Sequence, residues 1–216
     1  MFTGLIEEVG RITELSSARR RSRITVAAPR TSRSLKLGDS VAVSGVCLTA
    51  VQINRGESFS ADLAQETLAR TSFARIRKGA RVNLELPLQT GARFGGHSVQ
   101  GHVDGVGKLV SLLPISGAAD YWLTIALPKT MLPYVVEKGS LTVEGISLTV
   151  AGIQNGQVTV AILPHTYKVT NLRWLQPGAA LNIEVDVLAK YAAKMTAGRA
   201  SSSSRITMRR LVEEGF

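Results

Sequence analysis

The chain has 216 residues and a formal net charge of +10, with 44% hydrophobic and 19% charged residues. This composition excludes intrinsic disorder, because it supplies enough apolar side chains to bury cores. The single cysteine, Cys47, excludes an internal disulfide, and no apolar run approaches the ~20 residues needed to span a membrane. We therefore expect a globular cytoplasmic protein that is neither exported nor inserted in a membrane.

Much of the positive charge lies in two clusters of arginines. They are Arg19, Arg20, Arg21 and Arg23 near the start, and Arg199, Arg205, Arg209 and Arg210 near the end. Neither cluster is interleaved with aromatic residues, on which nucleic-acid bases would stack. The pattern favours a solvated basic surface over nucleic-acid binding, with an anionic partner as the alternative.

The first half of the chain shows the alternation of apolar and polar residues that is typical of β-strands. Residues 41–43 and 82–86 follow this period of two, and residues 54–56, Asn-Arg-Gly, mark a turn. Residues 91–97 are rich in glycine, which tolerates backbone angles that other residues avoid. We expect a linker there, with the boundary between two domains near residues 90–97.

The second half repeats this pattern and then changes. Residues 141–143 and 181–187 alternate, and Asn155-Gly156 is typical of a hairpin turn. After residue 187 apolar residues recur at helical spacing, at Leu188, Tyr191, Ala192 and Met195. This spacing predicts a helix whose apolar stripe packs either on its own barrel or against other subunits. The serine run 201–204 predicts a flexible linker after the helix.

The two halves are related by an internal repeat. GVCLTA at 45–50 returns as GISLTV at 145–150, and two further blocks recur in the same order about 100 residues apart. Such a nearly constant offset is typical of a duplicated domain. Short strands with frequent turns predict a closed barrel in each half. We therefore predict an all-β protein of two similar six-stranded barrels, residues 1–96 and 97–187, followed by a C-terminal helix and basic tail, residues 188–216.

The repeated segments differ in chemistry. Cys47 is matched by Ser147, Leu5 by His102, Asp62 by Ala161 and Glu66 by His165. His97 and His102 lack the further ligands of a zinc site, and no nucleotide-binding glycine motif or Ser-His-Asp order is present. The sequence therefore predicts two related small-molecule pockets without a metal, and a repeated β-turn without a ligand is the alternative.

Seven motifs, in order, carry a family resemblance. They are MFTG, GDSVAVSGVCLT, DLAQETL, GGHSVQGHVDG, GISLTV, LPHT and NIEVDVLAKY. Over residues 1–195 the chain resembles the riboflavin synthase family. The resemblance implies a transferase that needs no cofactor: two molecules of 6,7-dimethyl-8-ribityllumazine exchange a four-carbon unit, giving riboflavin and 5-amino-6-ribitylaminouracil. It also implies a homotrimer whose reaction sites are shared between subunits, and it raises an association with lumazine synthase as a further hypothesis.

The resemblance also assigns residues to two substrate pockets. The first pocket is expected to use Gly4, Leu5, Ile6, Cys47, Leu48, Thr49, Asp62, Leu63, Ala64, Gln65, Glu66 and Thr67. The second is expected to use Gly101, His102, Val103, Lys138, Ser147, Leu148, Thr149, Ala161, Ile162, Leu163, Pro164, His165 and Thr166. The catalytic candidates are Phe2, Ser40, Cys47, His102 and Ser147.

The family chemistry requires a base and a nucleophile. His102 is the candidate that would remove a proton from the activated methyl group of one lumazine. Water, a hydroxyl group or Cys47 would attack the other lumazine, and the sequence leaves these alternatives open. Ser44 departs from the family pattern, in which asparagine is frequent, and so does the arginine-rich tail. A non-catalytic lumazine- or flavin-binding protein of the same fold is the competing interpretation.

Overall fold

The computed structural model describes residues 1–18, 21–201 and 212–213. Arg19, Arg20 and the arginines at 205, 209 and 210 lie outside the described residues, as does the predicted serine linker after Ser201. Over the part of the chain that is described, no helix has the length and apolar character needed to cross a membrane.

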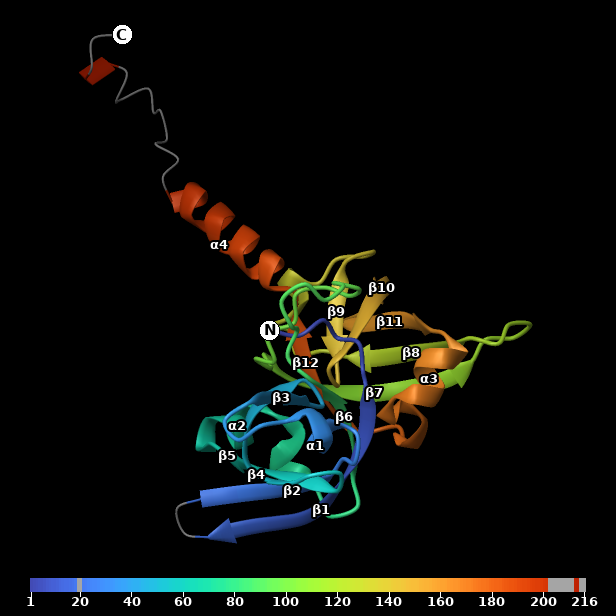
Figure 1. The fold of residues 1–216 in the computed structure, drawn as a ribbon. Coiled ribbons are helices and arrows are strands. Elements are labelled where there is room, and N and C mark those ends of the chain that lie inside the picture. The colour runs from blue at the N-terminus through green and yellow to red at the C-terminus, as the bar shows by residue number, and fades with distance from the viewer. Residues whose placement is uncertain (19–20, 202–211, 214–216) are drawn as a thin grey trace.

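The first half forms a closed barrel of six antiparallel strands in the order β1-β2-β5-β4-β3-β6 (Figure 1). Its elements are β1 (Glu8–Ala18), β2 (Arg21–Ala27), α1 (Thr31–Ser34), β3 (Ser40–Val43), β4 (Val46–Asn54), β5 (Ser58–Leu63), α2 (Gln65–Arg70), η1 (Ser72–Arg75) and β6 (Arg81–Glu85). Pairing of β1 with β6 closes the sheet, so the barrel has no free edge strand.

The second half forms another closed six-stranded barrel, in which β7 to β12 are paired as β1 to β6 are in the first. Its elements are β7 (Gly105–Pro114), β8 (Tyr121–Ala126), η2 (Leu132–Tyr134), β9 (Ser140–Val143), β10 (Ile146–Gln154), β11 (Gln157–Ile162), α3 (Pro164–Val169), η3 (Asn171–Trp174) and β12 (Ala180–Val185). The same register recurs in both barrels: Ser40 lies opposite Thr49, and Ser140 lies opposite Thr149. The predicted fold, a duplicated β-barrel, is confirmed.

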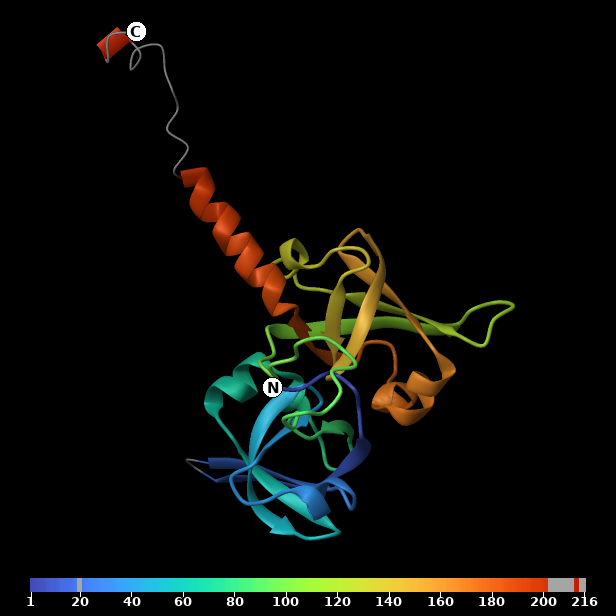
Figure 2. The ribbon, with the colours of Figure 1, turned by 45° about the horizontal axis from the view of Figure 1, so that its top comes forward.

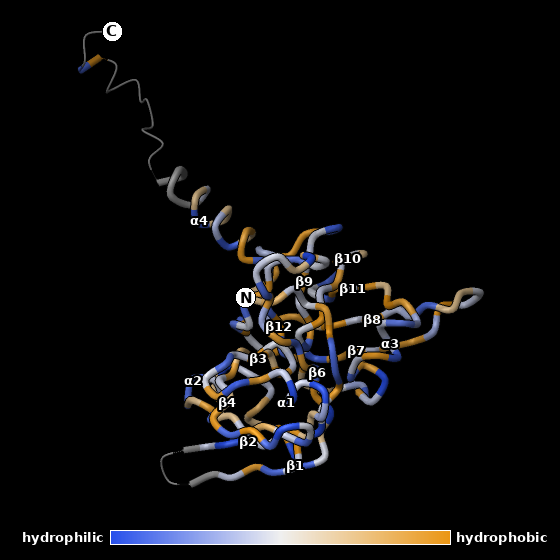
Figure 3. The backbone as a smooth tube through the Cα atoms, viewed as in Figure 1, coloured by the Kyte–Doolittle hydropathy of each residue, from blue (hydrophilic) through white to orange (hydrophobic). Residues whose placement is uncertain are grey.

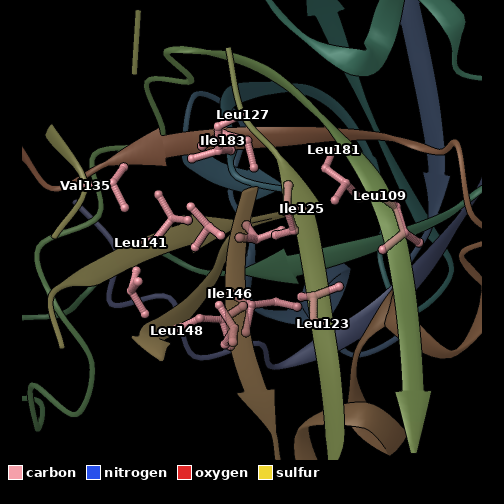
Figure 4. Packing of buried hydrophobic residues seen from close by; sticks show 14 of the residues in the cluster. Leu109, Leu123, Ile125, Leu127, Val135, Leu141, Ile146, Leu148, Leu181 and Ile183 are labelled. Atoms are coloured by element: carbon pink, nitrogen blue, oxygen red, sulfur yellow. The ribbon is translucent and has the colours of Figure 1, made fainter. Parts of the chain in front are cut away.

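Each barrel encloses its own apolar core. Along β4 and β10, alternate residues are buried, as expected where one face of a strand points inward. Figure 4 shows the second core, in which Ile125 from β8, Leu141 from β9 and Leu181 from β12 point into the interior. The hydropathy of the chain varies along the strands of both barrels (Figure 3). The opposite face of each strand therefore remains free to carry polar residues.

The predicted C-terminal helix is α4 (Val187–Ser201), which projects away from both barrels (Figures 1 and 2). Its base is fixed by an ion pair of 2.6 Å between Lys190 Nζ and Asp104 Oδ1. Leu188, Tyr191 and Met195 are 69%, 64% and 74% exposed. Of the two alternatives for this apolar stripe, packing on its own barrel is therefore wrong.

Candidate functional site

Two adjoining pockets lie against the first barrel and share Cys47 and Thr67. One has a volume of about 490 Å³ and is lined by Cys47, Leu48, Thr49, Val51, Asp62, Leu63, Ala64, Gln65 and Thr67. The other has a volume of about 400 Å³ and is lined by Val46, Cys47, Glu66, Thr67, Arg70, Thr71, Gly101, His102, Val103 and Asp104. Most residues assigned to the first pocket are thus brought together, with three from the second set.

The pleat of β4 determines which side chains face these pockets. Leu48 is buried in the core, whereas its neighbours Cys47 and Thr49 are half-buried and exposed. Ser40 lies directly opposite Thr49 on β3, so both side chains are on the outer face of the sheet. Cys47, Thr49 and Ser40 therefore form one polar strip beside the pocket.

The strand pairs β2–β5 and β8–β11 carry different side chains at one equivalent position of the two barrels. Arg23 and Asp62 are opposite each other on β2 and β5, and Arg23 Nε lies 2.6 Å from Asp62 Oδ1. The hydrogen bond that Arg23 donates to Asp62 is the main cause that raises the pKa of Arg23. At the equivalent place in the second barrel, Trp122 lies opposite Ala161. Arg23 was not selected from the sequence as a site residue, because its position in an arginine cluster suggested a solvated surface.

Two short segments, the first arm (residues 2–6) and the second arm (residues 99–103), precede the barrels. The Glu85 carboxylate on β6 accepts hydrogen bonds from Thr3 N at 2.6 Å and Gly4 N at 2.9 Å. The Glu184 carboxylate on β12 accepts the equivalent bonds from Gln100 N at 2.7 Å and Gly101 N at 3.0 Å. Burial raises the pKa of both glutamates, and the backbone donors oppose that rise. Each arm is therefore anchored to the last strand of its own barrel.

The tips of the arms are exchanged between the barrels. Ser147 N, in the second barrel, donates to Gly4 O at 2.8 Å, and Cys47 N, in the first, donates to Gly101 O at 2.8 Å. Ile6 packs against the second core and Val103 against the first. Each arm therefore crosses to the other barrel, and the assignment of Gly4, Leu5 and Ile6 to the first pocket and of Gly101, His102 and Val103 to the second stays a prediction.

The arms also pair with each other. Phe2 N donates to Val99 O at 2.7 Å, and Val99 N donates to Phe2 O at 3.1 Å. The Phe2 side chain is fully buried and packs with Ala42, Val99 and Cys47. Phe2 is thus a link between the two arms, and it also covers the strand pair that carries Cys47.

The residues assigned to the second pocket lie on equivalent elements. Ser147, Leu148 and Thr149 are on β10; Ala161 and Ile162 are on β11; Leu163, Pro164, His165 and Thr166 lie at and just before the start of α3. Lys138 has a φ of +64°, where its counterpart Gly38 has +87°. Lys138 thus has a backbone conformation in which its counterpart is glycine.

His97, which the sequence does not predict as a pocket or catalytic residue, contacts two hydroxyl groups of the second barrel. Its Nδ1 lies 2.6 Å from Ser147 Oγ, and its Nε2 lies 3.0 Å from Thr142 Oγ1. The ring is half-buried, and burial lowers the pKa of His97 below its usual value. The repeat could not identify this residue, because the equivalent position would precede Met1. Within the described ranges, no group of three or more His, Cys, Asp or Glu side chains could hold a metal ion.

Comparison with known proteins places this geometry in a family. The model of the lumazine binding domain matches residues 3–87 and 100–186. The riboflavin synthase of Mycobacterium tuberculosis (strain ATCC 25618 / H37Rv) is 42% identical over 90% of this chain and 98% of its own length. That of Bacillus subtilis (strain 168) is 37% identical over 100% of both chains.

The fold is also similar to solved structures. The crystal structure of LumP complexed with riboflavin superposes with a TM-score of 0.79 at 23% identity, and it covers 86% of this chain and 99% of LumP. That likeness agrees with the double barrel found in this chain. Because the domain model matches both halves of the chain and these riboflavin synthases match over nearly their full length, the chain belongs to the riboflavin synthase family.

Proposed function

We propose that this chain, as a riboflavin synthase, converts two molecules of 6,7-dimethyl-8-ribityllumazine into riboflavin and 5-amino-6-ribitylaminouracil by transfer of a four-carbon unit. The observation that carries the proposal is the pair of equivalent but chemically different sites, one around Cys47 and one around Ser147. A reaction between two copies of one substrate needs two similar binding sites. Because the copies play different parts, the sites must also differ.

The residues of each site suit different portions of the ligand. Backbone groups near Thr49 and Thr149 can pair with the pyrimidinedione edge, because the main chain offers both donors and acceptors. Asp62, Thr67 and Thr166 suit the hydroxyls of the ribityl chain. Orientation of two bound reactants can lower a barrier by roughly 7 to 11 kcal/mol, so holding the two lumazines supplies much of the rate.

The proton transfer and the nucleophilic attack are assigned to the vicinity of Cys47. His102 is exposed in the same pocket as Cys47 and is the proposed base for the activated methyl group. The nucleophile is water, a hydroxyl group or the Cys47 thiol. Since His102 belongs to the second arm and Cys47 to the first barrel, both halves of the chain supply groups to this site.

We propose further that the chain works as a homotrimer with each reaction site shared between subunits. Support comes from the exposed stripe of Leu188, Tyr191 and Met195 on α4, which projects from the barrels and is not covered by any of the described residues. Burial of such a stripe against other copies of α4 would remove apolar surface from water. The single cysteine favours a reducing compartment, so we place the enzyme in the cytoplasm. An association with lumazine synthase remains part of the proposal.

The direct test is turnover by the purified protein. Added 6,7-dimethyl-8-ribityllumazine should disappear as riboflavin absorbance and fluorescence rise, with two lumazines consumed for each riboflavin formed. Treatment with a metal chelator should leave the rate unchanged. Tight binding of the lumazine without any riboflavin formed would instead identify a non-catalytic chromophore-binding protein of the same fold.

A further inference from the structure

Thr142, Ser147 and His97 form a hydrogen-bonded chain beside the second pocket. Thr142 on β9 and Ser147 on β10 are direct cross-strand partners, so their side chains lie on the same face of the sheet. The His97 ring bridges them, with Nδ1 at 2.6 Å from Ser147 Oγ and Nε2 at 3.0 Å from Thr142 Oγ1. A single imidazole thus contacts both hydroxyls, and its tautomer decides the direction of both bonds.

Thr142, at the buried end of this series of hydrogen bonds, determines the direction of both bonds. The Thr142 side chain is 1% exposed, so its hydroxyl proton cannot be donated to bulk water. Among the residues that the structure describes, His97 Nε2 is the one acceptor recorded for Thr142 Oγ1. Thr142 therefore donates to Nε2, which must be unprotonated. In a neutral ring the proton is then on Nδ1 and is donated to Ser147 Oγ.

The two alternatives are less favourable. With the proton on Nε2, the Thr142 hydroxyl would lose its acceptor, and an unpaired buried donor costs about 1–3 kcal/mol. An imidazolium would also require Thr142 to accept, and burial already disfavours that charged form. The Nδ1-protonated ring leaves only the Ser147 hydroxyl proton without a partner. Ser147 is half-buried at the position equivalent to Cys47, which lines a pocket in the first barrel, so a bound ligand or water is the acceptor for that proton.

We propose that His97 is a positioning residue which, held by Thr142, makes Ser147 a hydrogen-bond donor to the ligand of the second pocket rather than a nucleophile activated by a base. This inference rests on the proposed function in one respect: the ligand is a pteridine-type ring. The matching group on the ligand is an acceptor, which means a carbonyl oxygen or an unprotonated ring nitrogen. A nucleophilic serine would need the opposite arrangement, with its proton on the histidine.

The first barrel has apolar side chains in place of Thr142 and His97 at the equivalent position. Its cross-strand pair is Ala42 and Cys47, and the buried Phe2 side chain packs on that pair. An alanine methyl and an aromatic ring cannot orient the Cys47 thiol by hydrogen bonds. The second site therefore presents an oriented hydroxyl donor where the first presents a thiol that packs beside Phe2 and Ala42. This difference would let two copies of one substrate bind in different ways.

The tautomer can be measured directly by nitrogen NMR on protein with labelled histidine. The chain has three histidines, and the His97 signals are assigned by their loss in His97→Gln. At neutral pH the free protein should show a neutral His97 ring with a protonated Nδ1 and an unprotonated Nε2. Thr142→Val, which removes the hydroxyl, should admit the other tautomer, whereas Thr142→Ser should retain the parent spectrum. A parent ring protonated at Nε2, or at both nitrogens, overturns the proposal.

A double-mutant cycle tests the consequence for the ligand, with riboflavin as the probe and quenching of its fluorescence as the measurement. His97→Gln should weaken binding by about twofold to tenfold, as expected for loss of one oriented hydrogen bond. In a Ser147→Ala background the same substitution should have no further effect, because its target is gone. Equal weakening in both backgrounds would mean that His97 only supports the fold, and the proposal would fail. No weakening in either background would also overturn it.

Thr142→Val and Thr142→Ser give a second cycle in case His97→Gln does not fold, as judged by its circular dichroism spectrum. Valine should weaken binding only where Ser147 is present, and serine should not weaken it. Neither measurement depends on turnover. A protein that passes both tests but forms no riboflavin would contradict the proposed function and leave the role of His97 standing.

Discussion

Ser44 and Glu144 occupy equivalent turns where the two barrels meet. Asn83 on β6 donates to Glu144 O, and Asn182 on β12 donates to Ser44 O, both at 2.9 Å. The Glu144 carboxylate accepts from Asn182 N at 2.8 Å and from Asn171 Nδ2 at 2.9 Å. Burial raises the pKa of Glu144, and these hydrogen bonds oppose the rise. A titratable group therefore lies in the interface between the barrels.

Glu144→Gln should change how stability depends on pH. Because the pKa of Glu144 is raised in the folded chain, its favourable contribution is complete below about pH 4.3, the ordinary glutamate pKa, and is lost as pH rises through the raised value. Urea denaturation between about pH 5 and about pH 8 should therefore show the variant gaining stability relative to the parent as pH rises. Glu57→Gln, at an exposed carboxylate, is the control. Parallel pH profiles of Glu144→Gln and the parent would contradict this prediction.

Gly45 and Gly145 bring the backbones of the two barrels into contact. Gly45 has a φ of +79°, and a Cβ added there would lie 2.8 Å from Gly145 N. Gly45→Ala should therefore lower the free energy of unfolding by about 2 kcal/mol more than Gly117→Ala, which has a similar φ of +76° but nothing within 4 Å of its Cβ. Urea unfolding of both variants measures the difference. Equal losses would show that backbone strain alone is responsible.

At the scale of elements, the strands were predictable because apolar residues alternate along them, although β3 and β9 are buried at three consecutive residues. The alternation in residues 41–43 and 141–143 was visible, and β3 and β9 lie there. The exchange of the arms was not predictable. Gly4 and Gly101 are equivalent in the repeat, and two duplicated halves have the same pattern whether an arm covers its own barrel or the other. His97 was missed for a related reason, since it lies before Val99, where the first aligned block of the repeat begins.

The α4 helix should determine the oligomeric state. Deleting residues 187–216 removes the exposed stripe of Leu188, Tyr191 and Met195 but leaves both closed barrels intact. We expect soluble monomers that still bind riboflavin but have little activity, as measured by light scattering and turnover. Deleting only residues 202–216 keeps α4 and should leave a trimer. A 187–216 deletion that stayed trimeric would show that the barrels themselves associate.

At the scale of the whole molecule, a reaction site shared between subunits can be tested by mixing variants. Thr49 and Thr149 are equivalent exposed positions, so tryptophan at either can block one pocket without entering a core. Thr49→Trp and Thr149→Trp homotrimers should each be nearly inactive. Mixed trimers, purified through two different tags, should regain part of the activity, because an open first pocket can face an open second pocket. Mixed trimers as inactive as their parents would place both pockets of each site within one chain.

The exchanged arms have a consequence for the order in which the chain folds during synthesis. The second arm follows the first barrel closely in the sequence, so Gly101 can reach Cys47 soon after that barrel has left the ribosome. Gly4 must instead wait for Ser147, from which it is separated by most of both barrels. Contacts so distant in sequence form slowly. The first arm is therefore made before the first barrel but is among the last segments to reach its place, and the Gly4 carbonyl waits for its partner until Ser147 has been made.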